Sequence, residues 1–265
     1  MSNDAEILDL LARWDRQQEG YIKQREERFA VMFEVLEAAF GQEFTVIDAA
    51  CGPGSLARRL LDRFPAAKVI AIDADVMLLE MARVSLSADA HRAQVVEVDL
   101  GKPTWVSKVL EAAQALGGQD PVAILSTTAL HWLSPGDLAE FYGHAGALLP
   151  TGGIVMNGDH MRYDSRWPTL SKIAKAVRQR VERQAVEDGE DDWAVWWDRA
   201  AKTPVLAELK KQRDAHFATI IPKRATSCED CSVDFHLASL RHAGFAETST
   251  IWQQLDNYVI FGRKP

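Results

Sequence analysis

The chain has 265 residues, and its 30 basic and 38 acidic residues give a net charge of −8 at pH 7. Hydrophobic residues make up 47% and charged residues 26%, the balance of a soluble globular protein with a sizeable core. No apolar run approaches the ~20 residues of a membrane span, and no secretory signal is visible at the N-terminus. We therefore expect no membrane partner. Nucleic acid is also unexpected, because its binding is driven by basic residues that neutralise phosphates.

The three cysteines are too few for a disulfide framework, and they predict a reducing, cytoplasmic location. Cys228 and Cys231 form a lone C-x-x-C, whereas a zinc site needs four ligands and Cys51 lies elsewhere. A redox role would require a thioredoxin-like context, which is missing. We expect ordinary loop cysteines and no metal.

Short apolar runs alternate with longer helical patterns over the first part of the chain. The predicted strands cover residues 44–49, 68–73, 93–98, 122–126 and 153–157. The predicted helices between them cover residues 56–64, 76–86, 105–116 and 136–149. Nearly continuous apolar strands that alternate with helices predict an α/β fold with a doubly wound, mostly parallel sheet.

The strand pattern stops after residue 157 and resumes near the C-terminus. Residues 159–225 have no convincing strand and are predicted to form a helical insertion, a substrate cap. The last two strands, 245–252 and 257–262, are separated by too few residues for a crossover helix, so they should form an antiparallel hairpin. The sheet then has about seven strands. The predicted domains are N-terminal cap helices over 1–40, a ligand-binding domain over 41–158 and 226–265, and the insertion.

A glycine loop joins the first predicted strand to the first helix after it, in the sequence VIDAACGPGSLA over residues 46–57. Such a junction brings a ligand against backbone N–H groups at a helix N-terminus. Gly52, Gly54 and Ala57 also satisfy the G-x-G-x-x-A pattern of dinucleotide sites, which leaves an NAD(P)-dependent oxidoreductase as one alternative. Asp48 favours a different ligand, because a carboxylate at the strand end would repel a pyrophosphate and attract an ammonium or sulfonium group.

Two more acids end the next two strands. Asp73 is placed to accept ribose hydroxyls, and Asp99 is placed to accept the exocyclic amine of an adenine. A single acid at a strand end is usually only a helix cap. The ordered set of three acids with a glycine loop instead indicates a cationic nucleoside ligand.

Five segments together resemble the motifs of class I S-adenosylmethionine (SAM)-dependent methyltransferases of the small-molecule branch. They cover residues 46–57, 71–83, 98–100, 124–133 and 148–153. The resemblance implies a Rossmann-like fold, SAM as the cofactor, and transfer of its methyl group by in-line displacement to a small-molecule acceptor. Two positions depart from the family pattern: Ala50-Cys51 replaces the commoner Gly-Cys, and Thr127 stands where relatives often carry Asn.

The cofactor contacts implied by the resemblance are Asp48, Ala50, Gly52, Gly54, Asp73, Ala74, Leu78, Asp99, Leu100, Ser126 and Thr127. The N-terminal helix with Tyr21, Arg25 and Arg28 would lie over the cofactor, where an arginine would pair with its carboxylate. An ordinary surface helix with a solvated charged face explains these three residues equally well.

If the acceptor is a hydroxyl, a general base assists the transfer. His131 follows the fourth strand and His160 follows the fifth, so both are candidate catalytic residues near the ligand-binding edge of the sheet. The alternatives are that His131 merely lines the pocket and that Asp159 caps a helix. A SAM-binding protein with a non-methylating or regulatory role also remains open.

The insertion should choose the acceptor, which we expect to be acidic or aromatic. Its predicted helix carries five basic residues, Lys172, Lys175, Arg178, Arg180 and Arg183, beside the acidic run 187–192. These residues form either a solvated face with local ion pairs or an attractive surface for a carboxylate or phosphate. The tryptophans Trp193, Trp196 and Trp197 are at helical spacing, which is typical of a cap core. The sequence leaves the oligomeric state open.

Overall fold

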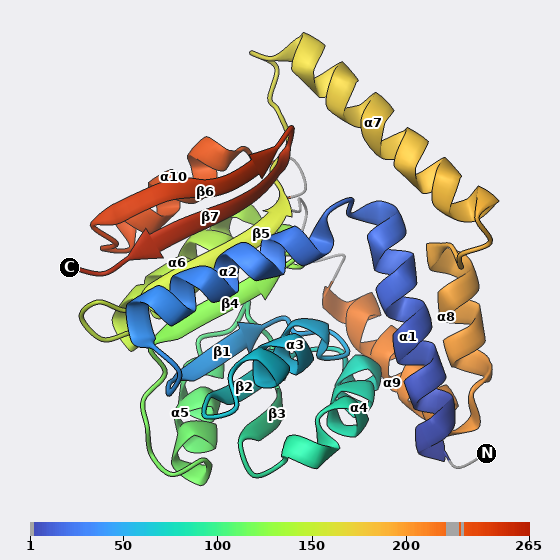
Figure 1. The fold of residues 1–265 in the computed structure, drawn as a ribbon, viewed down its shortest axis with the longest axis horizontal. Coiled ribbons are helices and arrows are strands. Elements are labelled where there is room, and N and C mark those ends of the chain that lie inside the picture. The colour runs from blue at the N-terminus through green and yellow to red at the C-terminus, as the bar shows by residue number, and fades with distance from the viewer. Residues whose placement is uncertain (1–2, 221–227, 229–230) are drawn as a thin grey trace.

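A seven-stranded sheet forms the centre of the computed structural model, which describes residues 3–220, 228 and 231–265 (Figure 1). The strand order is β3-β2-β1-β4-β5-β7-β6. The strands are β1 (Thr45–Ala49), β2 (Lys68–Asp73), β3 (Ala93–Glu97), β4 (Ala123–Thr127), β5 (Ile154–His160), β6 (Glu247–Gln254) and β7 (Asn257–Arg263). The first five are mutually parallel, whereas β7 runs antiparallel to both β5 and β6, which confirms the predicted hairpin.

Helices cover both faces of this sheet, as the buried apolar strands require. The first face carries α2 (Arg25–Phe40), α3 (Ser55–Arg63) and α4 (Val76–Ser85), the last followed by a short turn η1 (Ser87–Asp89). The opposite face carries α5 (Trp105–Ala115), α6 (Pro135–Leu148) and α10 (Val233–His242), with the short turn η2 (Leu130–Trp132) after β4. Because β1 to β5 are parallel, the loops after them meet at one edge, where ligands bind in such sheets.

The N-terminal helix and the insertion together form a cap at one side of the sheet (Figure 1). Its helices are α1 (Asn3–Tyr21), α7 (Pro168–Glu187), α8 (Trp193–Lys202) and α9 (Pro204–Ile220). Trp14, Trp196 and Trp197 are buried in an apolar cluster that α1, α8 and α9 share with α4. Trp196 also donates a hydrogen bond to the Leu10 carbonyl at 3.1 Å. The cap is therefore held by its own core, while α7 reaches away from the body of the molecule.

The N-terminal segment differs from the single helix expected over Tyr21, Arg25 and Arg28. It forms two helices, α1 and α2, separated by a turn in which Gln24 adopts a left-handed φ of 66°. Such a conformation is uncommon for a residue with a side chain, and no glycine at position 24 marks the break in the sequence. The turn lets α1 pack in the cap while α2 crosses the sheet.

The charges of the cap also differ from the local pairing considered above. Glu190 and Asp191, in the acidic run, pair with Arg16 of α1 and Arg199 of α8. Arg178 of the basic helix instead binds Asp256, in the turn between β6 and β7. The basic helix thus ties the cap to the C-terminal hairpin.

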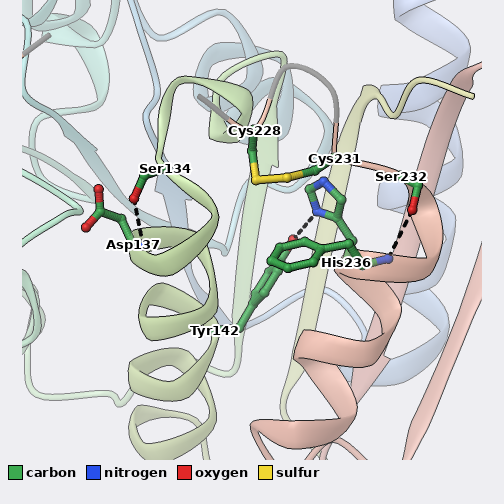
Figure 2. Close-up of a disulfide and its surroundings, with 8 residues drawn as sticks. Ser134, Asp137, Tyr142, Cys228, Cys231, Ser232 and His236 are labelled. Carbon is green, nitrogen blue, oxygen red and sulfur yellow. Dashed lines mark hydrogen bonds between the residues drawn. A yellow bond between two sulfur atoms is a disulfide. The ribbon is translucent and has the colours of Figure 1, made fainter. Parts of the chain in front are cut away.

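The two cysteines expected to be ordinary loop residues are joined in a disulfide, Cys228–Cys231 (Figure 2). The Cys228 amide donates to the carbonyl of Leu133, just after η2, at 2.7 Å. On the other side of the bond, α10 begins and its His236 ring is 2.9 Å from the hydroxyl of Tyr142 on α6. The disulfide therefore fixes the start of α10 beside the loop that follows β4. Among the described residues, no helix is long and apolar enough to cross a membrane.

Replacing both Cys228 and Cys231 by serine should lower the free energy of unfolding by about 2 kcal/mol. The bond closes only a short ring, so it removes little entropy from the unfolded chain. Urea unfolding of the variant and of the wild type, with and without dithiothreitol, measures the difference. The reduced wild type should match the serine variant, and identical stability of oxidised wild type and variant would contradict the bond.

Candidate functional site

The glycine loop after β1 is a tight turn with a left-handed backbone. Ala50, Gly52 and Gly54 have φ values of 54°, 55° and 85°. The Cys51 amide donates to the carbonyl of Ile72 on β2, which ties the loop to the neighbouring strand. A side chain at Gly54 would come within 3.3 Å of the Ala82 Cβ, so glycine also allows α4 to approach. The turn leads directly into α3, as the sequence predicted.

Asp48 makes a structural contact at this turn. Its side chain is buried, and Oδ2 accepts a hydrogen bond from the Ala57 amide in the first turn of α3 at 3.1 Å. Burial raises the pKa of Asp48 to about 7, the Ala57 hydrogen bond opposes that shift, and the charge of Asp73 adds to it. The carboxyl group is therefore partly protonated near neutral pH in the protein without ligand, rather than the fixed anion assumed from the sequence.

Asp73 closes the glycine loop from the end of β2. Its Oδ2 accepts from the Gly52 amide at 2.7 Å and its Oδ1 accepts from the Asp75 amide at 2.9 Å. Burial raises the pKa of Asp73 to about 6 against these hydrogen bonds. Ala74 follows it, and Asp75 caps α4 by accepting from the Met77 and Leu78 amides. The ends of β1 and β2 thus form one hydrogen-bonded unit.

Asp99 and Leu100 lie just past the end of β3. Oδ1 of Asp99 accepts from the Gly101 amide at 3.0 Å, and Lys102 lies 3.5 Å from its Oδ2. Leu100 is buried, as is Leu78 on α4. These residues continue the same edge of the sheet beyond Asp73.

Helix α1 covers the glycine loop from the cap side. A Cβ placed on Gly52 would lie 3.9 Å from the Trp14 ring. Asp15, the next residue, accepts from the Ser55 hydroxyl at 2.7 Å and pairs with Arg25 at 2.9 Å and Arg59 at 3.0 Å. Arg25 is thus committed to holding α1 and α2 at the loop.

Arg28 on α2 is fully buried beside the ends of β4 and β5. Its guanidinium donates to Asn257 Oδ1, to the Thr128 hydroxyl at 3.0 Å and to the Gly158 carbonyl at 3.1 Å. Among the described residues its Nη2 has no hydrogen-bond partner. Burial lowers the pKa of Arg28 to about 10, so the group remains a cation at neutral pH. A buried cation with a spare donor fits a carboxylate ligand.

His131 lies in η2, after β4, and faces Asp159 on β5. Its Nδ1 is 3.0 Å from each carboxylate oxygen of Asp159. Burial alone would raise the pKa of Asp159, but His131 and then Arg28 lower it to about 2. Ser126 and Thr127 end the same strand, β4, with Ser126 buried. Asp159 is thus an ionised partner of His131 that the sequence interpretation had treated only as a helix cap.

His160 ends β5 on the other side of Asp159. Neither of its ring nitrogens has a hydrogen-bond partner among the described residues, and the nearest carboxylate oxygen, of Asp256, is 3.7 Å away. Burial and the charge of Arg28 lower the pKa of His160 to about 3, so its ring is neutral. It lines a small cavity of about 30 Å³ with Tyr21, whose hydroxyl accepts from the Trp193 amide at 3.1 Å.

Two clusters therefore occupy one edge of the sheet. The glycine loop with Asp48 and Asp73 forms the first, and Arg28, His131 and His160 belong to the second. Asp159 was the main omission of the sequence interpretation, although it carries the signal used for the other acids: a carboxylate near the carboxyl end of a parallel strand.

A family described as "Methyltransferase domain" matches residues 46–153, from β1 to the turn before β5. This match covers the glycine loop, the three acidic strand ends and the His131 turn. Residues 46–153 of the chain therefore resemble a methyltransferase domain. SAM is the cosubstrate of such domains, and the match favours this interpretation over an NAD(P)-dependent oxidoreductase.

Two proteins named trans-aconitate 2-methyltransferase are similar over part of the chain. The protein from Azoarcus sp. (strain BH72) is 35% identical over 74 residues, 28% of each chain. The protein from Paracidovorax citrulli (strain AAC00-1) is 27% identical over 129 residues, which is 49% of this chain and 44% of that protein. The alignments thus span less than half the length of these relatives.

Solved methyltransferase structures share the fold. An O-methyltransferase family protein from Burkholderia thailandensis aligns with a TM-score of 0.54 at 18% identity, over 98% of this chain and 72% of that chain. An O-methyltransferase family 2 protein from Planctomyces limnophilus, solved with apigenin, aligns with a TM-score of 0.57 at 16% identity, over 99% and 62%. At these identities the likeness is one of fold.

The residues of this chain fit SAM at two points. Gly52 and Gly54 adopt left-handed φ values before α3, and neither presents a side chain to a ligand that approaches the turn. Arg28 supplies a buried cation with an unused donor for an amino-acid carboxylate.

Asp48→Asn should stabilise the protein more at pH 8 than at pH 5. The folded-state pKa of about 7 lies above the unfolded value of about 3.9, so the free energy of unfolding of the wild type falls as pH rises from about 4 to 7. The variant has a neutral amide at this position and does not lose this free energy of unfolding, which amounts to up to about 4 kcal/mol in the wild type. The amide oxygen can still accept the hydrogen bond from the Ala57 amide. Urea unfolding at both pH values tests this. The exposed acid in α3 provides the control: Asp62→Asn should show no such pH dependence, and equal effects of Asp48→Asn at both pH values would contradict a raised pKa.

Proposed function

We propose that this protein transfers the methyl group of SAM to a small-molecule acceptor bound beside the ends of β4 and β5. The observation that carries the proposal is the pairing of the Asp73-closed glycine loop with the buried, incompletely bonded Arg28 at one edge of the sheet. The first offers a nucleoside site and the second an anchor for a carboxylate, the two chemically distinct ends of SAM.

The assignment of individual contacts follows the order of the strands. We assign Gly52, Gly54 and Arg28 to the methionine portion, with Ala50 and the backbone of Ser126 and Thr127 beside it. Asp73 and Ala74 are assigned to the ribose, and Leu78, Asp99 and Leu100 to the adenine. Asp48 adds negative charge near the methionine portion once a cation restores its ionised form. Tyr21, which shares a cavity with His160, is assigned to the same wall of the site.

When bound, SAM supplies an electrophilic methyl group on a sulfonium, so the protein mainly has to align an acceptor and exclude water. Helix α1 of the cap covers the glycine loop through Trp14 and Asp15 and so helps to exclude water. The proposed acceptor side, at β4 and β5, is next to the proposed cofactor side, at β1 and β2, because β4 pairs with β1.

Of the two candidate bases, we assign the proton-accepting role to His131. The ring of His160 is a very weak base, because burial and Arg28 lower its pKa to about 3. His131 instead faces an ionised carboxylate, which stabilises a proton on the ring. His160 then lines the acceptor site as a neutral polar group.

We infer the acceptor class from the relatives and from the residues beside His160. The relatives named for trans-aconitate suggest small carboxylic acids for the first screen, and the fold relative solved with apigenin adds phenols. Lys23 lines the His160 cavity together with the Arg178–Asp256 ion pair. Together these observations support a small acidic or aromatic molecule.

Isothermal titration with S-adenosylhomocysteine tests the cofactor site directly. We expect binding by the wild type and a 10- to 100-fold weaker affinity for Arg28→Lys, because a buried hydrogen bond to a charged group contributes about 1.5–3 kcal/mol. Arg92→Lys is the matched control. Arg92 is also largely buried and donates to carbonyl groups, but these carbonyls belong to Leu61 and Phe64 at the C-terminal end of α3. Because this end of α3 is opposite to the glycine loop, the replacement should leave the affinity unchanged.

Turnover is tested by mass analysis of acceptor panels of carboxylic acids, phenols and amines incubated with SAM. An acceptor that gains one methyl group supports the proposal. Absence of binding heat with S-adenosylhomocysteine would contradict the proposed function. Binding without turnover across the panels would indicate a SAM-binding protein that does not methylate.

A further inference from the structure

We infer that Asp159 is the positioning residue for a His131 general base, and that the acceptor is a hydroxyl or phenol which loses its proton during methylation. This inference rests on the proposed methyltransferase function and specifies its acceptor group. It makes Asp159 part of the machinery although it touches neither reactant.

The geometry joins two neighbouring strands. Asp159 is 1% exposed near the end of β5, and both its carboxylate oxygens lie 3.0 Å from His131 Nδ1, after β4. Oδ1 also accepts from the His160 amide at 2.8 Å, which fixes the plane of the carboxylate. The register Thr127↔Gly158 brings these two strand ends together. The imidazole therefore has a defined orientation set by a buried side chain.

The same contact fixes which ring nitrogen carries the proton. An ionised carboxylate only accepts hydrogen bonds, so Nδ1 of His131 must be the protonated nitrogen. In the neutral ring, Nε2 is then the basic atom. A buried aspartate that holds a histidine in this tautomer and offsets the charge of the imidazolium, without taking the proton itself, is the arrangement of a catalytic triad.

The other titratable groups around Asp159 do not replace His131 as its partner. Arg28 on α2 is the neighbouring cation, and it is held by Asn257, Thr128 and Gly158. His160 is neutral, and burial also lowers the pKa of His236 on α10 to about 4.

Tyr142 on α6 is the remaining titratable neighbour. Burial raises its pKa, and its hydroxyl hydrogen-bonds to His236. Among these neighbours, His131 is the histidine whose ring nitrogen lies within hydrogen-bond distance of both Asp159 oxygens.

This arrangement distinguishes between acceptor classes. A carboxylate is already ionised at neutral pH and gains nothing from a base, whereas a hydroxyl or phenol must lose a proton. In the balanced step, the acceptor oxygen bonds to the methyl carbon, its proton passes to Nε2 of His131, and the electron pair of the broken C–S bond stays on sulfur. A positioned base is therefore expected for an O–H acceptor.

The first test measures the interaction between His131 and Asp159 without catalytic turnover. Histidine side-chain NMR of the protein saturated with S-adenosylhomocysteine, with His131→Gln used for assignment, gives the pKa of His131. Asp159→Asn should lower that pKa by about 1–3 units, because it removes the adjacent negative charge. Asp256→Asn, which removes the buried carboxylate nearest His160, is the matched control and should leave the His131 signal unchanged. An unchanged His131 pKa in Asp159→Asn would overturn the positioning role.

The second test uses turnover with a phenol or hydroxyl acceptor identified in the panels. Asp159→Asn should lower kcat by about 10²–10⁴-fold and shift the acidic limb of the kcat–pH profile, with little change in the KM for SAM. Asp159→Glu, which keeps the charge, should recover part of kcat and serves as the second variant if the amide fails to fold.

Methylation of carboxylates alone, at a rate that Asp159→Asn leaves unchanged, would overturn the acceptor assignment. Failure of the proposed function is distinguishable from failure of this inference. In that case no acceptor is methylated, yet the His131 pKa still depends on Asp159.

Discussion

The cofactor side of the site is organised by two carboxyl groups buried next to each other, Asp48 at the end of β1 and Asp73 at the end of β2. Burial raises both pKa values, to about 7 and about 6, although each group accepts backbone hydrogen bonds. Ionising both groups is therefore unfavourable in the protein without ligand. A cationic ligand at the glycine loop would remove part of this penalty. Burial of the two carboxylates would then lower the stability of the free protein and raise its affinity for the cation.

On the proposed acceptor side, the surroundings of a buried carboxylate lower its pKa instead of raising it. Asp159 is as buried as Asp48, but His131 and Arg28 stabilise its charge and its pKa is low. The difference follows from the neighbours: Asp48 is close to a backbone amide and another acid, whereas Asp159 faces the Arg28 guanidinium of α2 and the His131 ring of η2. Parallel strands bring these two environments to one edge. The sheet thus brings the two buried acids of the glycine loop and the Asp159–His131 pair to the same edge.

The sequence predicted the features that depend on local pattern. The strand and helix order, the C-terminal hairpin and the glycine loop follow from periodicity and turn residues, and the structure confirms them. The fifth strand is longer than predicted, because β5 continues to His160 where it pairs with β7. Features that depend on distant contacts were missed. Arg28 is fixed partly by Asn257, 229 residues away in the chain, and Gln24 adopts a left-handed turn without the usual glycine.

The disulfide and the acid–histidine pair were missed for related reasons. A C-x-x-C spacing fits both a free and a bonded pair, and the structure resolves it by placing Cys228 against Leu133. Asp159 was recognised as an acid beside His160, but its partner His131 lies in η2, after β4. Only the register of β4 against β5 brings the two together.

The cap lies outside the family match, so similarity to that family gives no information about the residues of the cap. The family match ends at residue 153, before Asp159, His160 and the whole insertion, so it describes the cofactor half of the site. The cap reaches that half through α9, where Arg213 stacks 3.9 Å over Trp197 and pairs with Asp75 at the start of α4. It reaches the acceptor half through α7, where Arg178 binds Asp256. One insertion therefore contacts both ends of this edge, the start of α4 through Arg213 and the C-terminal hairpin through Arg178.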